Sequence, residues 1–136
     1  MSTEIATIFG IGYLRPAPGT WGSLFALILA ILLLESFGII GFVLSLLFAS
    51  VFGWWATSEY LKQTTNKDPS EVVIDELIGL WIAVLPTAWA VFHYNVSSLD
   101  LWPGWTSSFF FFRIFDIYKP SLIGWADKKN GVLGVM

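Results

Sequence analysis

Three carboxylates lie in strongly apolar stretches of the sequence, where an unpaired charge is costly. Asp75 and Glu76 stand between aliphatic residues at the start of a long apolar run, and Asp116 closely follows four consecutive phenylalanines. A metal ion or a basic partner would offset that cost, whereas solvated acids at a membrane surface are the alternative. The chain has no cysteine and one histidine, so its oxygen ligands favour a hard cation, above all Mg²⁺. We therefore predict Asp75, Glu76 and Asp116 as catalytic, metal-binding residues.

A glycine- and proline-rich segment, GIGYLRPAPGTWGS at residues 10–23, has the composition of an anion site. Glycine lets backbone N–H groups approach a phosphate, the following helix N-terminus carries a partial positive charge, and arginine binds phosphate oxygens in pairs. The alternative is a plain loop in which Thr20 caps the next helix. The residues predicted here to bind phosphate are Arg15, Gly19, Thr20, Gly22 and Ser23.

A second group of charges follows the phenylalanine run, in the segment RIFDIYKP at residues 113–120. At 100° per residue, Arg113, Asp116 and Lys119 fall within one arc of a helix and give one face the charge order plus, minus, plus. We predict Arg113 and Lys119 as further phosphate-binding residues. The alternative is an Arg113 and Asp116 pair that neutralises itself, with Lys119 extended toward the membrane surface.

The acids of the sequence DPSE at residues 68–71 need no catalytic role. Asp68 fits an N-cap, Pro69 the first helical position and Glu71 the third, so this segment predicts a helix start. The helix is expected to run on through residues 72–76 and to be kinked at Pro86. Asp75 and Glu76 would then lie beyond the capping turn.

The whole composition predicts one all-α, polytopic membrane domain over residues 1–136. The chain is 56% hydrophobic and 12% charged, which argues against a soluble fold and against disorder. With 7 Lys and Arg against 10 Asp and Glu, it does not resemble a nucleic-acid-binding protein. Four membrane-embedded helices are expected, from apolar runs at residues 24–34, 37–56, 77–92 and 101–112. The short first and fourth runs extend to residues 20–37 and 103–118.

The seven Lys and Arg residues all fall on one side of this arrangement. They precede the first run, separate the second from the third, or follow the fourth, while the connections around Glu35 and residues 93–101 have none. The positive-inside rule makes the basic segments cytoplasmic. His93 is then an interfacial residue on the opposite side. Tryptophans at the ends of the runs fit either interfacial belts or packing; they are Trp54, Trp55, Trp102 and Trp105. A signal peptide over residues 1–38 is a weaker alternative.

The same topology puts the charged residues at one cytoplasmic level. Carboxylates with a hard cation, two arginines, a lysine and a glycine-rich helix start make a phosphate-ester site at the membrane surface. The expected partners are a membrane phospholipid and the bilayer. No nucleic acid and no obligate protein partner are expected.

Four blocks of the sequence resemble the phosphatidylglycerophosphatase A family: RPAPGTWGS at residues 15–23, IDELIG at 74–79, FRIFDIYKP at 112–120 and GVLGVM at 131–136. The resemblance covers most of the chain. It implies a Mg²⁺-dependent phosphatase of the bacterial inner membrane, with a site facing the cytoplasm, that converts phosphatidylglycerophosphate to phosphatidylglycerol and phosphate in phospholipid biosynthesis. The family's acidic blocks fall on Asp75, Glu76 and Asp116, and its basic ones on Arg15, Arg113 and Lys119.

Two departures from the family pattern are expected to matter. The family commonly continues with Trp-Pro where this chain has Ser121 and Leu122. Its last glycine-rich stretch leads into two aspartates and a further helix, so a chain that stops at Met136 reads as truncated. Two other functions stay open: a non-enzymatic membrane scaffold or transporter subunit, and a lipid phosphotransferase. Charges gathered at one face argue against a transporter, and only the resemblance separates hydrolysis from transfer.

Overall fold

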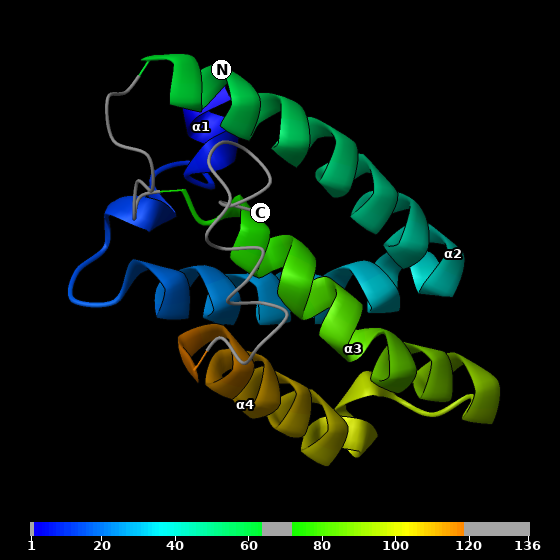
Figure 1. Cartoon of the computed structure of the whole chain (residues 1–136). Coiled ribbons are helices and arrows are strands. Elements are labelled where there is room, and N and C mark those ends of the chain that lie inside the picture. The colour runs from blue at the N-terminus through cyan, green and yellow to red at the C-terminus, as the bar shows by residue number, and fades with distance from the viewer. Residues whose placement is uncertain (1, 64–71, 119–136) are drawn as a thin grey trace.

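The computed structural model describes residues 2–63 and 72–118, and the regular secondary structure in this part is all helical. Four α-helices are joined by short connections and two single 3₁₀ turns (Figure 1). The all-α prediction is confirmed for this part of the chain. In chain order the elements are α1 (Ser2–Ala6), η1 (Ile11–Tyr13), α2 (Pro18–Gln63), α3 (Ile74–Tyr94), η2 (Ser98–Leu101) and α4 (Trp102–Tyr118).

The helix α2 is a hairpin of two helical arms. Gly38 interrupts it with φ 66° and ψ −172°, a left-handed conformation that favours glycine. Figure 1 shows the chain turning back there, so that the two arms run in nearly opposite directions. Leu29 and Leu33 of the first arm and Leu44 of the second line a common apolar groove. The first arm, residues 18–37, matches the predicted extension of the first apolar run.

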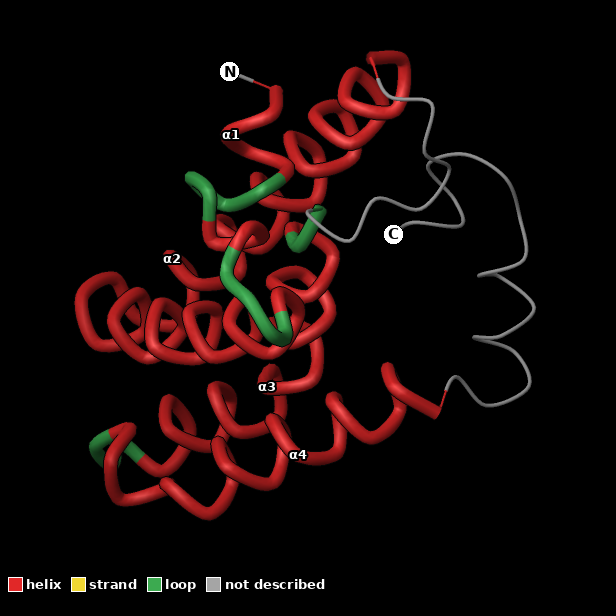
Figure 2. Tube along the Cα trace, turned by 90° about the vertical axis from the view of Figure 1, so that its left-hand side faces the viewer, coloured by secondary structure: helices red, strands yellow, loops and turns green. Residues whose placement is uncertain are grey.

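The helix α3 lies at the centre and packs against α2 and α4 (Figure 2). Its Trp81 is 3% exposed and touches both arms of α2. The indole Nε1–H donates to the Ala26 carbonyl at 2.9 Å, and the Phe42 ring lies 5.6 Å away between centroids. An apolar ring with a paired N–H suits a dry interior. α3 therefore sets the positions of its neighbours.

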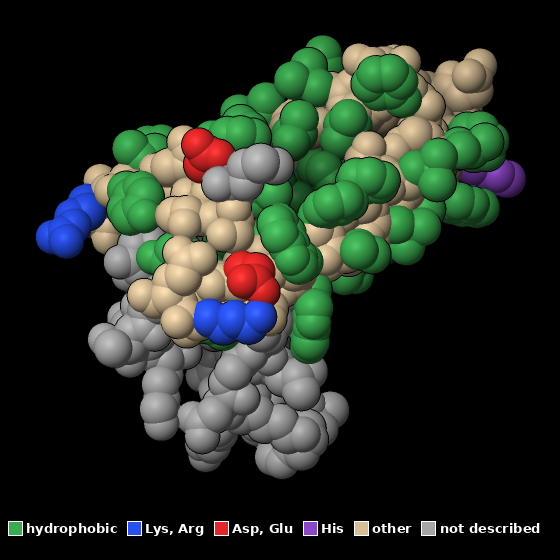
Figure 3. Space-filling model, turned by 90° about the horizontal axis from the view of Figure 1, so that it is seen from above, with side chains coloured by type: hydrophobic (Ala, Val, Ile, Leu, Met, Phe, Trp, Pro, Cys, Tyr) green, Lys and Arg blue, Asp and Glu red, His purple; other side chains and the backbone are tan. Residues whose placement is uncertain are grey.

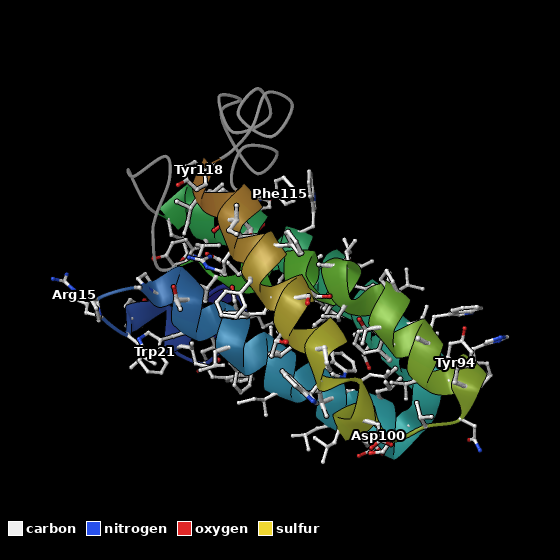
Figure 4. The ribbon with its side chains drawn as sticks, turned by 90° about the horizontal axis from the view of Figure 1, so that it is seen from below. Arg15, Trp21, Tyr94, Asp100, Phe115 and Tyr118 are labelled. Atoms are coloured by element: carbon white, nitrogen blue, oxygen red, sulfur yellow. The ribbon has the colours of Figure 1, made fainter. Side chains whose placement is uncertain are left out.

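The two ends of the bundle differ in chemistry. Arg15, Lys62 and Arg113 belong to segments at one end, whereas the Gly38 turn and η2 form the other (Figure 4). At that second end the Ser98 N–H donates to Glu35 Oε1 at 2.8 Å. The two connections without Lys or Arg are thus joined, as the one-sided distribution of basic residues requires.

Much of the surface is apolar. Figure 3 shows hydrophobic side chains over most of one face, with acidic and basic side chains toward one end and the histidine at the other. Leu47 and Phe48 are 58% and 66% exposed on the second arm of α2. Within the described residues, α2 and α3 are the helices long and apolar enough to cross a membrane, and α4 has 17 residues. Trp105 is 2% exposed and donates to the Ser98 carbonyl, so packing explains it.

The predicted start of α3 is wrong. Residues 72 and 73 are not helical, and α3 begins at Ile74. The Val73 N–H donates to the Ala6 carbonyl at 3.0 Å, so a contact with α1 ties this backbone outside the helix. Residues 68–71, where a cap was expected, lie outside the described residues. Pro86 lies inside α3, which continues to Tyr94.

Candidate active site

The predicted site residues gather where the first turns of α2 and α3 meet the last turns of α4. Trp21, at the start of α2, and Phe115 and Tyr118, near the end of α4, lie toward one end in Figure 4, and Asp100 lies toward the other. α3 runs antiparallel to α4, so its first turn reaches the same end as the last turns of α4 (Figure 1). Three segments far apart in the sequence thus meet.

The start of α2 contributes backbone and small side chains. The N–H groups of Thr20 and Trp21 both donate to the Ala17 carbonyl, so the helix begins at Pro18. The alternative in which Thr20 caps the helix is wrong, because Thr20 already lies in the first turn. Ser23 is fully buried and its hydroxyl donates to the Gly19 carbonyl at 2.8 Å.

The glycine-rich loop before α2 binds mainly to itself. The Gly10 N–H donates to Thr7 Oγ1, and the Gly12 N–H donates to the Thr7 carbonyl. The N–H groups of Ile11, Tyr13 and Leu14 donate to carbonyls of residues 8–11. The backbone donors of residues 10–14 are therefore already used, and the first turn of α2 is the part of the predicted anion segment that faces the carboxylates.

Gly19 and Gly22 let two other segments approach α2 closely. An added Cβ at Gly19 would collide with Glu76 Oε1 and lie 3.2 Å from Arg113 Nη1. At Gly22, which is buried, it would lie 3.0 Å from the Val73 Cβ. A side chain at position 19 would therefore have to displace the Glu76 carboxylate, which lies beside the Arg113 guanidinium.

Arg113 connects the three helices. Its Nη1 lies 2.6 Å from Asp116 Oδ2 in an ion pair, and its Nη2 donates to Thr20 Oγ1 at 3.3 Å. The Arg113 side chain is 16% exposed and that of Asp116 is 32% exposed. The self-neutralising pair that the sequence allowed is present. It uses part of the guanidinium, whose other nitrogen points to α2.

Asp75 and Glu76 occupy the first turn of α3, where the helix dipole favours negative charge. Glu76 interacts electrostatically with both Asp116 and Arg113. Asp75 Oδ1 and Glu76 Oε2 are buried and have no hydrogen-bond partner among the described residues. Buried carboxylate oxygens without donors are costly, and a hard cation is a ligand that would satisfy them.

The described residues contain no group of three His, Asp or Glu side chains close enough to hold a metal ion. The carboxylates of Asp75 and Glu76 fit Mg²⁺ in ligand type, while the Asp116 carboxylate is held by Arg113. The fit therefore rests on two adjacent carboxylates with unpaired oxygens, and Asp116 approaches them from α4.

Two of the predicted basic residues lie away from this cluster or outside the described chain. Arg15 is exposed on the loop before α2 and points outward in Figure 4. Lys119 lies outside the described residues. His93 stacks on Trp89 at 4.5 Å near the other end of α3, as expected for a residue far from the site.

The sequence of the chain matches that of a known protein family. A sequence model of phosphatidylglycerophosphatase A matches residues 4–136. The chain belongs to the phosphatidylglycerophosphatase A family. That family consists of phosphatases, which are phosphoric monoester hydrolases. Of the four blocks that carried the resemblance, those at residues 15–23, 74–79 and 112–120 contain the residues of the cluster.

Three relatives cover nearly the whole chain. "Phosphatidylglycerophosphatase A" of Haemophilus influenzae is 33% identical over 97% of this chain and 76% of its own length. A "Putative phosphatidylinositol-3-phosphatase" of Bacteroides thetaiotaomicron is 36% identical over 97% and 80%. "Phosphatidylglycerophosphatase A" of Escherichia coli is 28% identical over 97% and 71%. No solved structure matches.

Sequence reasoning missed residues that fix the helices around the candidate site. Val73 and Ala6, which fix the start of α3, carry no chemical signal in the sequence. Gly79 is the last residue of the IDELIG block, and the sequence alone predicts no role for it. An added Cβ there would lie 2.6 Å from the Phe112 ring, so α3 and α4 meet at this point. The spacing of small residues along both helices could have revealed it.

Proposed function

We propose that this protein hydrolyses phosphatidylglycerophosphate to phosphatidylglycerol and phosphate, as a Mg²⁺-dependent step of phospholipid biosynthesis at the cytoplasmic face of a bacterial inner membrane. The observation that supports it most is Arg113, which bridges the first turn of α2 and the acidic residues of α3 and α4. Metal-dependent hydrolysis of a phosphate monoester uses positively charged hydrogen-bond donors and metal-binding carboxylates, both close to the phosphate.

In this proposal the anion-binding residues line one side of the site. The Arg113 guanidinium binds phosphate oxygens, helped by the Thr20 hydroxyl and the N-terminal dipole of α2. Gly19 keeps this surface open. Gly22 and Ser23 are buried and hold the first turn in place. Arg15 and Lys119 are further phosphate-binding candidates from the sequence, although Arg15 points outward and Lys119 lies outside the described residues.

The carboxylates form the other side. Asp75 and Glu76 would hold the cation with their unpaired oxygens, and Asp116 would join them while it orients Arg113. A Mg²⁺ ion held by these residues would supply Lewis-acid chemistry to the phosphoryl group and lower the pKa of a water bound to it. Asp75 Oδ1 and Glu76 Oε2 are buried, and a charge interacts more strongly with atoms that are shielded from water.

The position of the site in the bilayer follows from the basic residues. Arg15, Lys62 and Arg113 share one end of the bundle with the carboxylates, and the positive-inside rule makes this end cytoplasmic. A lipid headgroup at the interface could then reach the cluster while its acyl chains stay against the apolar helices.

The substrate assignment is tested by comparing two lipid phosphomonoesters. The protein in detergent is given Mg²⁺ with either phosphatidylglycerophosphate or phosphatidylinositol 3-phosphate, since a relative is named for the latter. We expect faster phosphate release from phosphatidylglycerophosphate. Preferred release from the inositol lipid would reject the substrate assignment but keep the phosphatase. Absence of release from either lipid by wild-type protein would favour the scaffold or transporter alternative.

Hydrolysis and transfer are separated by product analysis. In water containing ¹⁸O, a hydrolase places the label in the released phosphate. A phosphotransferase given an excess of glycerol would instead move the phosphoryl group to the alcohol, and glycerol phosphate would accumulate.

A further inference from the structure

Two glycines on α3 and α4 form a reciprocal contact. An added Cβ at Gly79 of α3 would lie 2.6 Å from Phe112 Cε2, and one at Gly104 of α4 would lie 2.8 Å from Thr87 Cγ2. The two positions on each helix are eight residues apart, close to two turns, so both contacts lie on one antiparallel interface. Each helix gives one glycine and receives one side chain.

The residues between these contacts are also small. On α3 the row runs Gly79, Ala83, Thr87, and on α4 it runs Gly104, Ser108, Phe112. Small residues four apart let membrane helices approach closely, because nothing but packing and hydrogen bonds holds such helices together. The row therefore defines how far α4 can slide or rotate along α3.

The same register sets the level of the polar cluster. Asp75 lies four residues before Gly79, and Asp116 lies four residues after Phe112. Antiparallel helices locked at Gly79 and Phe112 thus bring Asp116 to the level of Asp75 and Glu76. A shift of one turn, about 5.4 Å, would separate these carboxylates.

Arg113 depends on the same contact. It is the residue after Phe112 and lies 100° further around α4, which turns it from α3 toward α2. α4 packs mainly on α3 and much less on α2. The reach of Arg113 to Thr20, at 3.3 Å, is therefore set by the seating of α4 on α3 rather than by α2.

We propose that Gly79 is a positioning residue of the site: it seats the Phe112 ring and so fixes the register and rotation that carry Arg113 to α2 and Asp116 to Asp75 and Glu76. This rests on the proposed function for its consequence in catalysis. The geometric part stands apart from it, because α4 would move whether or not the site is active.

The experiment replaces Gly79 with larger residues and follows both position and rate. Gly79→Ala and Gly79→Leu should lower kcat in that order, with about 10- to 100-fold loss for the larger side chain, since small misplacements of catalytic groups cost that much. Gly104→Ala is the comparison. It creates a similar contact, with Thr87, at the end of the same interface that lies far from the cluster, so it should lower kcat less than Gly79→Ala does.

A second variant restores the space. Phe112→Ala removes the ring that the new Cβ meets, so Gly79→Ala with Phe112→Ala should recover more activity than Gly79→Ala alone. In an Arg113→Ala background, Gly79→Ala should cost much less, because the residue it positions is already gone. If Gly79 had a purely structural role, Gly79→Ala would lower the stability of the protein equally with Arg113 and with Arg113→Ala.

The position of α4 is measured without activity. Spin labels on Trp21→Cys of α2 and Ile117→Cys of α4, in a chain that has no natural cysteine, report the distance between these helices. Both positions are exposed. Gly79→Leu should lengthen or broaden that distance more than Gly104→Leu does, because Gly79 lies nearer to the labelled end. An unchanged distance and wild-type kcat in Gly79→Leu would overturn the inference. Failure of wild-type protein to release phosphate would instead reject the proposed function and leave the distance test intact.

Discussion

Arg113 donates to Thr20 across 93 residues of sequence, at 3.3 Å. Its other terminal nitrogen lies 2.6 Å from Asp116. The planar guanidinium has five N–H donors, so it can serve both partners and still offer donors to a phosphate, whereas the ammonium of lysine has three donors and no planar fork.

The first prediction concerns this fork. Arg113→Lys should reduce kcat by about 10- to 100-fold, as expected for a lost charge-assisted pair of hydrogen bonds. Expression and Tm should stay close to those of wild type. Arg15→Lys should have a smaller effect of the same kind, because Arg15 is exposed.

Lys62→Arg is the control for both variants. Lys62 pairs with Glu59 at the surface and lies outside the cluster. If Arg113→Lys is as active as Lys62→Arg in phosphate release, Arg113 is a membrane anchor and the phosphate is bound elsewhere.

The second prediction concerns the cation. EDTA should abolish phosphate release and Mg²⁺ or Mn²⁺ should restore it, because carboxylate and phosphate oxygens favour hard ions. Asp75→Asn nearly preserves volume but removes charge, and should raise the Mg²⁺ concentration needed for half-maximal rate. Asp100→Asn, in the capping box at the other end, is the control. An unaltered Mg²⁺ dependence in Asp75→Asn would contradict the metal assignment.

The third prediction concerns Gly19. Gly19→Ala places a Cβ against the Glu76 carboxylate and near Arg113, so kcat should fall. Alanine favours a helix over glycine by about 1 kcal/mol, which offsets part of the steric cost, so Tm should change little. In a Glu76→Asp background the carboxylate is one methylene shorter, and Gly19→Ala should then cost less. An equal loss of kcat in both backgrounds would show that Gly19→Ala does not act through the Glu76 carboxylate.

The fourth prediction separates the two ends of the bundle. Glu35→Gln weakens the acceptor of the Ser98 N–H, which joins α2 to the start of η2. We expect a modest decrease in Tm with kcat unchanged, because these residues lie opposite to the cluster. A large loss of kcat at unchanged Tm would place part of the chemistry at this end.

The fifth prediction concerns sidedness. A cysteine at Gln63 should resist an impermeant thiol reagent added outside the inner membrane, while one at Leu99 should react. Both positions are exposed, so access and not burial decides the result. Labelling of Gln63→Cys from outside would show that the topology is the opposite of the one predicted.

The helices were predictable because their signals are local. Apolar runs located the helical regions, and the extensions to residues 20–37 and 103–118 agree with the first arm of α2 and with α4, Trp102–Tyr118. The second run, 37–56, stops seven residues short of the end of α2 at Gln63. The start of α3 failed for the opposite reason. The hydrogen bond from Val73 to Ala6 joins segments far apart, and no local pattern records it.

The candidate site was predictable as a set of residue types and not as a geometry. Charge spacing on one helix face anticipated the Arg113 and Asp116 pair, which needs only residues three apart. That Arg113 also reaches Thr20 depends on how α4 sits on α3. Arg15 shows the reverse case, since its motif pointed to the cluster and its side chain points outward.

The two arms of α2 meet at Gly38 without an intervening loop, so almost nothing hydrophilic has to be carried through hydrocarbon during insertion. Glu35 and Ser36 are the polar side chains nearest the turn, and the neighbouring Phe37 and Ile40 are apolar and 69% and 74% exposed. Helices satisfy their own backbone groups in lipid, and one non-helical residue leaves few unpaired. The two arms can thus enter a bilayer together as one helical hairpin.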